Sequence, residues 1–316
     1  MNRGIGIAFS LLVLVAAIFA FAPRIPTPLP SQGIAVDSLL LLDATQVGQR
    51  FIAVGERGHI LLSDDAGNSW QQALSPTPAT LTSVYFHDAQ LGWAVGHDSV
   101  ILKTTNGGKA WRQIYSAPEQ QKPLLKVWFS DARNGYAMGA YGLFLRTQDG
   151  GAAWQAHKIM DADLHLNALA ALHDGQLIIA GEAGLLLRSS DQGQTWKPLS
   201  SPYKGSFFGL LTTSDNSLLV YGLRGHVFRS TDAGNSWQAV ETGIQATLLG
   251  GYMQPDASVL LAGQNGTVLI SHDQGKSFSK QLHPERKCVT ALRPSGKDML
   301  LFGESGVKQF ANSVLW

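Results

Sequence analysis

Four residues of this 316-residue chain have side chains that together could act on a glycosidic bond: Tyr141, Glu182, Arg57 and Arg224. A tyrosine beside a carboxylate can serve as the nucleophile in one class of glycoside hydrolysis, and arginines can bind the carboxylate of an acidic sugar. Two arginines are too few for the cluster that such a substrate needs. We therefore predict no catalytic residue and keep a glycan-binding or glycan-cleaving protein as the alternative.

Metal chemistry finds no better support in the sequence. The nine histidines do not follow the spacing of metal ligands, and His59 and His226 occupy the same position of a repeat, which indicates a role in packing. Calcium binding to the repeated loops would need several carboxylates in each, whereas Asn106 replaces even the single aspartate of one loop. We predict neither a metal nor a cofactor. The single cysteine, Cys288, excludes an intramolecular disulfide.

An eight-residue motif recurs along the chain and carries its architecture. It begins with Ser or Thr, has Asp or Asn at the third position and Gly at the fifth, and ends in Trp or Phe. Its six copies lie at residues 63–70, 104–111, 147–154, 189–196, 230–237 and 271–278. The closing aromatic residues are 41 to 43 residues apart. The Asp or Asn can accept hydrogen bonds from the loop backbone and the glycine can take a positive φ, so this octet is expected to be a rigid hairpin loop.

A second motif, G-x-x-G, precedes each octet and occurs once more near the C-terminus. Its glycine pairs are Gly55/Gly58, Gly139/Gly142, Gly181/Gly184, Gly222/Gly225, Gly263/Gly266 and Gly303/Gly306, with Gly96/Ser99 as the imperfect member. The chain therefore contains seven units of about 41 residues. In the second unit, alternating apolar runs predict strands at 81–86, 92–95, 100–104 and 111–115.

Repeats of this length with four short strands are typical of propeller blades. We predict an all-β fold, a seven-bladed β-propeller of four-stranded antiparallel blades that occupies residues 34–316 and is preceded by a signal or anchor segment. The tryptophans that close five octets are expected to pack in the core, although exposed rings could stack on a ligand. The last unit is about twelve residues short. Either the stretch N-terminal to Ser38 or the segment 313–316 is expected to complete it.

The N-terminus differs from the repeats. Residues 4–21 form an apolar run after Arg3, and residues 20–22 have the small-x-small pattern of a signal-peptide cleavage site. We predict a signal peptide at 1–22, or an uncleaved membrane anchor in which residues 4–21 provide the tether, because 18 apolar residues almost span a bilayer. A proline-rich linker at 23–33 follows. The propeller is then expected to be exported to the periplasm, or to the thylakoid lumen if the host is photosynthetic.

Charge excludes one class of partner. The chain has 24 basic and 23 acidic residues, and Arg3 belongs to the signal segment, so the mature chain after residue 22 is neutral. Nucleic-acid binding is therefore not expected. We also expect the propeller to be monomeric.

Propeller topology places the octets on one face and the G-x-x-G turns, together with the linkers between blades, on the other. The octets are nearly constant, whereas the residues within the G-x-x-G turns vary, and variable residues on a fixed frame are where specificity usually resides. We predict that a partner binds to this ring of turns, although the residues could also be ordinary polar turn residues. The predicted binding residues are Glu56, Arg57, His97, Asp98, Tyr141, Glu182, Arg224, Gln264, Asn265 and Glu304.

Four consecutive units also place a basic residue four positions after the second residue of the turn pair: Lys103, Arg146, Arg188 and Arg229. These residues could form an anionic docking patch. The alternative is a structural role in which they pair with neighbouring carboxylates, including the octet aspartate, while their stems cover apolar surface.

Residues 81–111, with the run GWAVG at 92–96 and the octet that follows, resemble the Asp-box (BNR) repeat of the photosystem II assembly and stability factors of chloroplasts and cyanobacteria, and of their relatives in non-photosynthetic bacteria. Residues 127–154 also match well. The resemblance implies an exported seven-bladed scaffold that binds a membrane-protein complex or its assembly intermediate through an arginine-rich patch, without catalysis. Asp-box repeats also resemble those of sialidases, which is why the glycan alternative stays open.

Overall fold

The computed structural model describes residues 35–296 and 298–310. The predicted signal or anchor, the proline-rich linker and the segment 313–316 lie outside this part of the chain. Within the described ranges, no helix is long and apolar enough to cross a bilayer.

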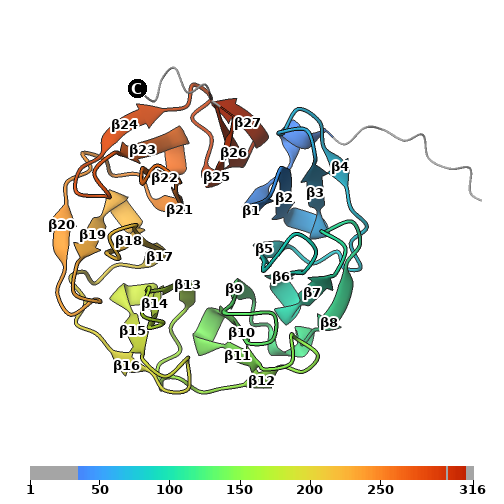
Figure 1. The fold of residues 1–316 in the computed structure, drawn as a ribbon, viewed down its shortest axis with the longest axis horizontal. Coiled ribbons are helices and arrows are strands. Elements are labelled where there is room, and N and C mark those ends of the chain that lie inside the picture. Colours follow the sequence, from blue (N-terminus) through green and yellow to red (C-terminus); the bar gives the residue numbers. More distant parts are fainter. Residues whose placement is uncertain (1–34, 297, 311–316) are drawn as a thin grey trace, which may run out of the picture. The chain divides into compact units, whose positions relative to one another are not determined.

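Seven antiparallel sheets form a ring, as the sequence predicted (Figure 1). The first strand of each sheet lies innermost and the fourth outermost. The strands of blades 1 to 4 are β1 (Leu41–Val47), β2 (Arg50–Gly55), β3 (Ile60–Ser63) and β4 (Gln71–Gln72); β5 (Leu81–Phe86), β6 (Gly92–Gly96), β7 (Ile101–Thr104) and β8 (Arg112–Tyr115); β9 (Leu124–Phe129), β10 (Gly135–Gly139), β11 (Phe144–Thr147) and β12 (Gln155–Ala156); and β13 (Leu166–Ala171), β14 (Leu177–Gly181), β15 (Leu186–Ser189) and β16 (Lys197–Pro198).

Blades 5 and 6 have four strands and blade 7 has three among the described residues. These strands are β17 (Phe207–Thr212), β18 (Leu218–Gly222), β19 (Val227–Ser230) and β20 (Gln238–Val240); β21 (Leu248–Met253), β22 (Val259–Gly263), β23 (Thr267–Ser271) and β24 (Ser279–Leu282); and β25 (Val289–Ser295), β26 (Asp298–Gly303) and β27 (Gly306–Phe310). The strands predicted for the second unit are confirmed to within one residue.

Short 3₁₀ helices occupy the G-x-x-G turns between the second and third strands of blades 1 to 6. They are η2 (Glu56–Gly58), η3 (His97–Ser99), η5 (Ala140–Gly142), η6 (Glu182–Gly184), η7 (Leu223–Gly225) and η8 (Gln264–Gly266). Two further 3₁₀ helices lie in linkers, η1 (Val36–Ser38) before blade 1 and η4 (Pro118–Gln120) before blade 3.

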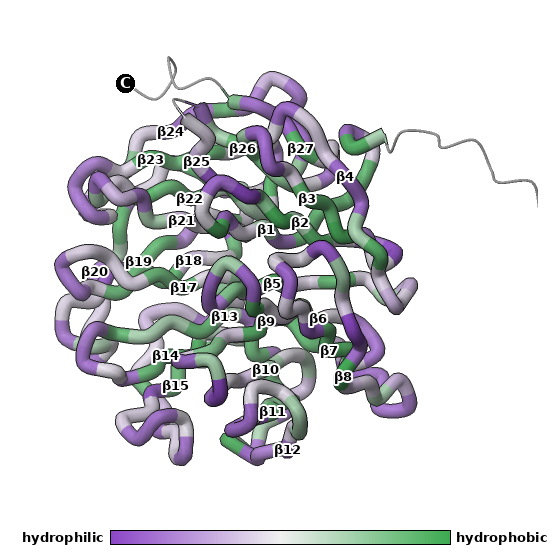
Figure 2. Tube along the Cα trace, turned by 45° about the vertical axis from the view of Figure 1, so that its right-hand side comes forward, coloured by the Kyte–Doolittle hydropathy of each residue, from purple (hydrophilic) through white to green (hydrophobic). Residues whose placement is uncertain are grey.

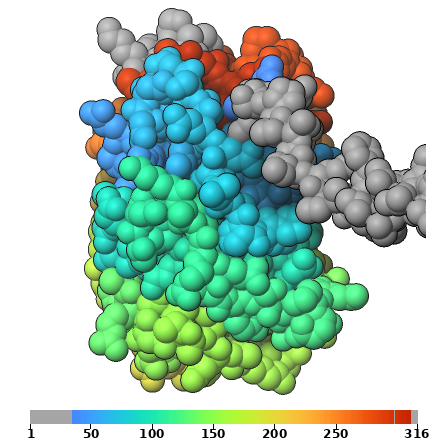
Figure 3. All heavy atoms as spheres, turned by 90° about the vertical axis from the view of Figure 1, so that its right-hand side faces the viewer, coloured from blue at the N-terminus to red at the C-terminus, as the bar shows by residue number. Residues whose placement is uncertain are grey.

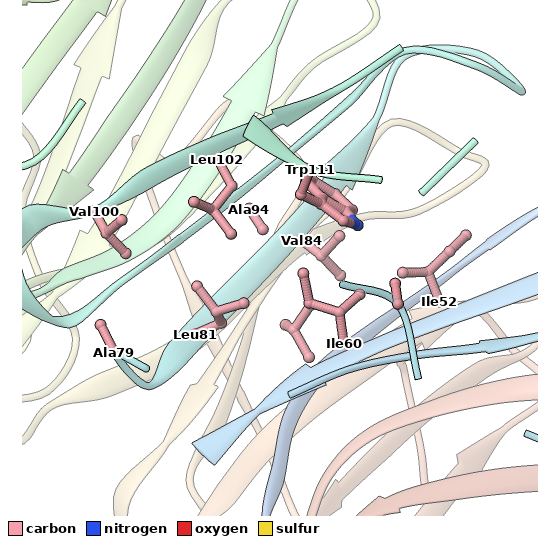
Figure 4. Packing of buried hydrophobic residues seen from close by; sticks show 11 residues of the cluster. Ile52, Ile60, Ala79, Leu81, Val84, Ala94, Val100, Leu102 and Trp111 are labelled. Carbon is pink, nitrogen blue, oxygen red and sulfur yellow. The ribbon is translucent and has the colours of Figure 1, made fainter. Parts of the chain in front are cut away.

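The hydrophobic core lies between neighbouring sheets. Ile52 and Ile60 of blade 1 pack against Leu81, Val84 and Trp111 of blade 2, as Figure 4 shows. Apolar residues therefore follow the strands, whereas the hairpin loops are polar (Figure 2). Such burial between blades must hold the chain together, since its only cysteine is free.

Ring closure brings the first and last blades together, and Figure 3 shows the blades in chain order along one side, with the red of the last beside the blue of the first. The Thr290 hydroxyl of β25 donates to the Leu41 carbonyl of β1 at 2.8 Å. Gly306 N–H of β27 donates to the Leu39 carbonyl at 2.8 Å. The first contact joins the innermost strands of the two blades, and the second joins the G-x-x-G turn of blade 7 to the segment before blade 1.

Completion of blade 7 by a fourth strand stays a prediction, because residues 1–34 and 313–316 lie outside the described chain. The described residues just N-terminal to Leu39 form η1 rather than a strand. A Cβ at Gly306 would lie 1.6 Å from the Val36 carbonyl oxygen, much as a Cβ at Gly58 would lie 1.9 Å from that of Thr77 in the linker after β4. The η1 segment thus occupies the place of a blade-to-blade linker.

Candidate docking face

The G-x-x-G turns have their shape because two backbone segments pass close to both glycines. A Cβ on Gly55 would lie 2.1 Å from the Leu40 carbonyl oxygen, so only glycine fits there. Gly58 has a φ of +70° and faces the next linker equally closely. In blade 2, Ser99 takes the second position with a φ of 50°, and its hydroxyl donates to the Lys122 carbonyl at 2.6 Å. The turn is therefore clamped between the residue that precedes the first strand of its own blade and the linker to the next blade.

The first residue within the turn is a repeated hydrogen-bond acceptor in four blades. The Glu56 carboxylate accepts the N–H of Leu40 at 3.0 Å, immediately before the first strand of its own blade. The same bond recurs from His165 N–H to Glu182, from Thr247 N–H to Gln264 and from Cys288 N–H to Glu304. Glu or Gln at this position was the sequence signal, although the structural role was not predicted. Four of the ten predicted binding residues thus fix the turn, and their contact with a partner stays a prediction.

The second residue within the turn is exposed to solvent in blades 1 to 6. It has a left-handed backbone in these blades, with φ between 52° and 58°. These residues are Arg57, Asp98, Tyr141, Ala183, Arg224 and Asn265. Asn and Asp tolerate this conformation, but for arginine and tyrosine it costs on the order of 1 kcal/mol. Arg57, Tyr141 and Arg224 therefore occupy exposed positions at which asparagine or glycine would be less strained. His97, the first residue of the blade 2 turn, is exposed as well.

Tyr141 and Glu182 are linked through a third residue that the sequence did not suggest. The Tyr141 ring is 49% exposed and meets the His165 ring edge-on, with centroids 5.0 Å apart. His165 Nε2 lies 3.8 Å from Glu182 Oε2. Arg57 stands on blade 1 and Arg224 on blade 5, each two blades away from Tyr141 on blade 3. The four residues considered for glycan chemistry are therefore distributed around the ring.

Arg224 lines an open groove of about 470 Å³ between its turn and the segment 239–245, which runs from the end of β20 into the following linker. His226 and Glu241 share the lining, and the His226 ring lies 4.3 Å from that of Tyr203. The Arg224 guanidinium lines this groove and can bind a carboxylate of an extended acidic segment. Tyr203 and His226 were not predicted to lie at a site.

The basic residues on the opposite side of the blades connect each blade to the next. Lys103 Nζ donates to the Gly150 carbonyl at 2.7 Å, Arg188 Nη1 to the Ala233 carbonyl at 3.3 Å, and Arg229 Nε to the Gln274 carbonyl at 3.1 Å. Each acceptor belongs to the octet of the following blade. For these three residues the structural interpretation is confirmed in this form: the acceptors are octet carbonyls rather than the octet aspartate, and among the described residues Arg229 also pairs with the carboxylate of Asp215 at 2.5 Å. Arg146, the fourth residue of the set, has a buried Nε without a hydrogen-bond partner among the described residues.

Octet carboxylates are occupied within their own loops. Asp65 accepts the Ser69 N–H at 2.9 Å and the Ser69 and Ser63 hydroxyls, and these bonds lower the pKa of its carboxyl to about 2. The equivalent Asp273 also has a pKa of about 2, because its hydrogen bonds from Ser277 and Ser271 outweigh its partial burial. Within 35–296 and 298–310, no group of three or more His, Cys, Asp or Glu side chains could hold a metal ion. The octet face therefore offers a rigid frame rather than free ligands.

Comparisons with known proteins agree with this fold. The family model of the photosynthesis system II assembly factor YCF48 matches residues 34–119 and 109–250. A structure of YCF48 bound to D1 peptide is 20% identical, covers 87% of this chain and 92% of its own, and has a TM-score of 0.70. YCF48 from Cyanidioschyzon merolae is 18% identical, covers 90% and 98%, and has a TM-score of 0.69.

The same fold also occurs in an enzyme. Virginiamycin B lyase from Staphylococcus aureus is 11% identical, covers 88% of this chain and 96% of its own, and has a TM-score of 0.76. Among curated proteins, none matches the chain. The propeller fold alone therefore does not decide between binding and catalysis.

Proposed function

Because the chain belongs to the family of the photosystem II assembly factor YCF48, we propose that it is a non-catalytic binding scaffold for a membrane-protein complex or its assembly intermediate. The partner docks on the face formed by the G-x-x-G turns. One observation carries the proposal: Arg57, Tyr141 and Arg224 are exposed on one face in a backbone conformation that disfavours them. A solved relative, YCF48 bound to D1 peptide, gives support from the family.

The docking face in this proposal includes an acidic-segment site around Arg224, where the groove lies. Guanidinium groups form paired hydrogen bonds with carboxylates, so an acidic stretch of the partner is the natural ligand. The basic residues on the other side are less suitable, since Lys103, Arg188 and Arg229 already donate to octet carbonyls.

Export is part of the proposal. Residues 1–22 have the composition of a signal peptide or an anchor, which would bring the propeller to the periplasm or, in a photosynthetic host, to the thylakoid lumen. Cell fractionation and sequencing of the N-terminus of the purified protein test it. A protein recovered from the cytoplasm with residue 1 or 2 at its N-terminus would contradict export.

Charge reversal tests the docking face. Arg57→Glu/Arg224→Glu is compared with Lys109→Glu/Lys276→Glu, which changes the net charge equally but affects exposed octet-face residues. The full-length protein is used to capture partners from solubilised membranes of its host, and captured subunits are identified by mass spectrometry. We expect the arginine variant to lose the membrane-protein subunits that the wild type and the lysine variant retain.

Equal retention by both variants would contradict the proposed face, and equal loss would indicate general charge attraction. Catalysis is tested separately with a fluorogenic sialoside. Turnover by the wild type that is absent in Tyr141→Phe would contradict the scaffold function itself.

A further inference from the structure

The central channel contains a charged cluster that the docking face does not include. A cavity of about 200 Å³ lies between the first strands of the blades. Three of the described residues that line it are charged: Asp43 on β1, Lys126 on β9 and Arg293 on β25. They come from blades 1, 3 and 7, so only closure of the ring brings them together.

The Asp43 carboxylate forms no short ion pair with Lys126 or Arg293. Its carboxylate accepts the Ala44 N–H at 2.9 Å, the Ser83 hydroxyl at 3.0 Å and the Val84 N–H at 3.1 Å. Lys126 Nζ lies 3.5 Å from Asp43 Oδ2, and Arg293 Nη2 lies 3.9 Å from Oδ1. Close pairs of this kind are about 2.8 Å apart. The short hydrogen bonds to Asp43 thus come from Ala44, Ser83 and Val84 rather than from the two cations. With one carboxylate and two cations, the cluster has a net charge of +1.

Arg293 is held in a fixed orientation. Only 16% of its side chain is exposed, Nη1 donates to the Leu292 carbonyl at 2.6 Å, and the guanidinium carbon lies 5.2 Å from the centre of the Tyr252 ring. Burial lowers the pKa of the guanidinium, while Asp43 acts in the opposite direction. An arginine remains protonated in proteins, so a fixed positive charge faces the cavity.

Tyr221 contributes a hydroxyl group to the cavity, and two glycines leave the room that its ring needs. A Cβ at Gly209 would lie 2.0 Å from Tyr221 Cζ, and a Cβ at Gly251 would lie 2.4 Å from its hydroxyl oxygen. The tyrosine therefore passes over both glycines to line the cavity. Burial raises the pKa of its hydroxyl, so the group stays a neutral hydrogen-bond donor at neutral pH.

We propose that the central channel is a carboxylate-binding site formed by Lys126, Arg293 and Tyr221. One carboxylate balances the net charge of the cluster, and a guanidinium, an ammonium and a hydroxyl are donors that suit it. The cavity has the volume of about six or seven water molecules, which is enough for a small organic acid or the end of a peptide. The site does not depend on the proposed docking face.

Titration calorimetry of the full-length protein with succinate tests the proposal, with succinamide as the neutral control. We expect succinate to bind and succinamide not to bind. Lys126→Gln and Arg293→Gln should each weaken succinate by about tenfold or more, and Tyr221→Phe by about threefold to tenfold. Arg57→Gln should leave the affinity unchanged. Circular dichroism verifies that each variant is folded. If Arg293→Gln does not fold, Lys126→Gln decides the test, because the Lys126 side chain is 35% exposed and its substitution should not disturb the fold.

Equal affinity for succinate and succinamide, no binding of succinate at about 10 mM, or wild-type affinity in folded Lys126→Gln would each overturn the proposal. A short peptide with a free or an amidated C-terminus identifies the source of the carboxylate. Binding of the free form alone, displaced by succinate, supports a peptide end, whereas binding of succinate without either peptide supports a free acid. Arg57→Glu/Arg224→Glu should keep succinate binding, so failure of the docking face and failure of the channel site are distinguishable.

Discussion

The tryptophans that close the octets fall into two classes, which predict different costs for the same substitution. Trp111 Nε1 donates to the Gly108 carbonyl at 2.9 Å, and Trp196 Nε1 donates to that of Gly193 at 3.2 Å. Trp154 Nε1 and Trp237 Nε1 are buried and have no hydrogen-bond partner among the described residues. We compare Trp→Phe at these four positions, because phenylalanine keeps most of the ring and removes the N–H group.

The expected costs follow from the N–H group and the lost ring volume. Removing about 35 Å³ from a packed site costs about 1 kcal/mol at all four positions. At Trp111, the substitution also leaves the buried Gly108 carbonyl without its donor, which costs about 1–3 kcal/mol more. At Trp237, it removes a buried donor that lacks a partner, which offsets the volume loss by a similar amount. Trp111→Phe should therefore cost about 2–4 kcal/mol and Trp237→Phe about 0–1 kcal/mol.

Urea unfolding at pH 7, followed by far-UV circular dichroism, measures both free energies without relying on tryptophan fluorescence. Trp196→Phe should behave as Trp111→Phe does, and Trp154→Phe as Trp237→Phe does. The urea dependence of each should match the wild type, so that the midpoints can be compared. If the two classes differ by less than about 1 kcal/mol, the hydrogen bond of the indole does not decide the stability of the octet, and this reasoning is wrong.

Three further predictions concern the frame and the turns. Octet carboxylates have lowered pKa values, about 2 for Asp65 and Asp273, so their contribution to stability is complete above about pH 4 and is lost as the pH falls towards 2. Asp149→Asn should lower the urea midpoint at pH 7 only slightly and make acid unfolding less steep, because Asn106 in blade 2 accepts the equivalent bonds without a charge. Arg224→Asn, which copies Asn265, should raise the free energy of unfolding by about 0.5–1 kcal/mol yet weaken partner capture, and a loss of stability would contradict strain at this turn. Arg229→Met should cost about 2 kcal/mol, measured in urea, because it removes the donor to the Gln274 carbonyl and to Asp215 Oδ2, whereas Lys276→Met should have no effect.

The sequence predicted the repeating part of the structure well, because a turn that is clamped by its own backbone leaves a signature in residue type. The octet and the G-x-x-G motif are local, so spacing alone located seven blades and the two faces. Side chains that act between blades leave no such signature. Lys103 and Arg188 bind carbonyl oxygens about 45 residues away, and any residue has a carbonyl. The sequence could therefore suggest an octet aspartate as the acceptor but could not identify the octet carbonyl that is used.

The same limit applies to the two candidate binding regions. The turn residues were predicted as a set, but only the structure separates Glu56 and its equivalents, which accept a backbone N–H, from Arg57 and its equivalents, which face solvent. Asp43, Lys126 and Arg293 are far apart in the chain and follow no motif, so no pattern could have joined them. These three residues come together only when the ring closes. The hydrogen bond from Thr290 to Leu41 lies at that junction, and Thr290 itself lines the central cavity. A variant that loosens the junction, such as Thr290→Val, is therefore expected to weaken succinate binding while it leaves partner capture at Arg224 intact.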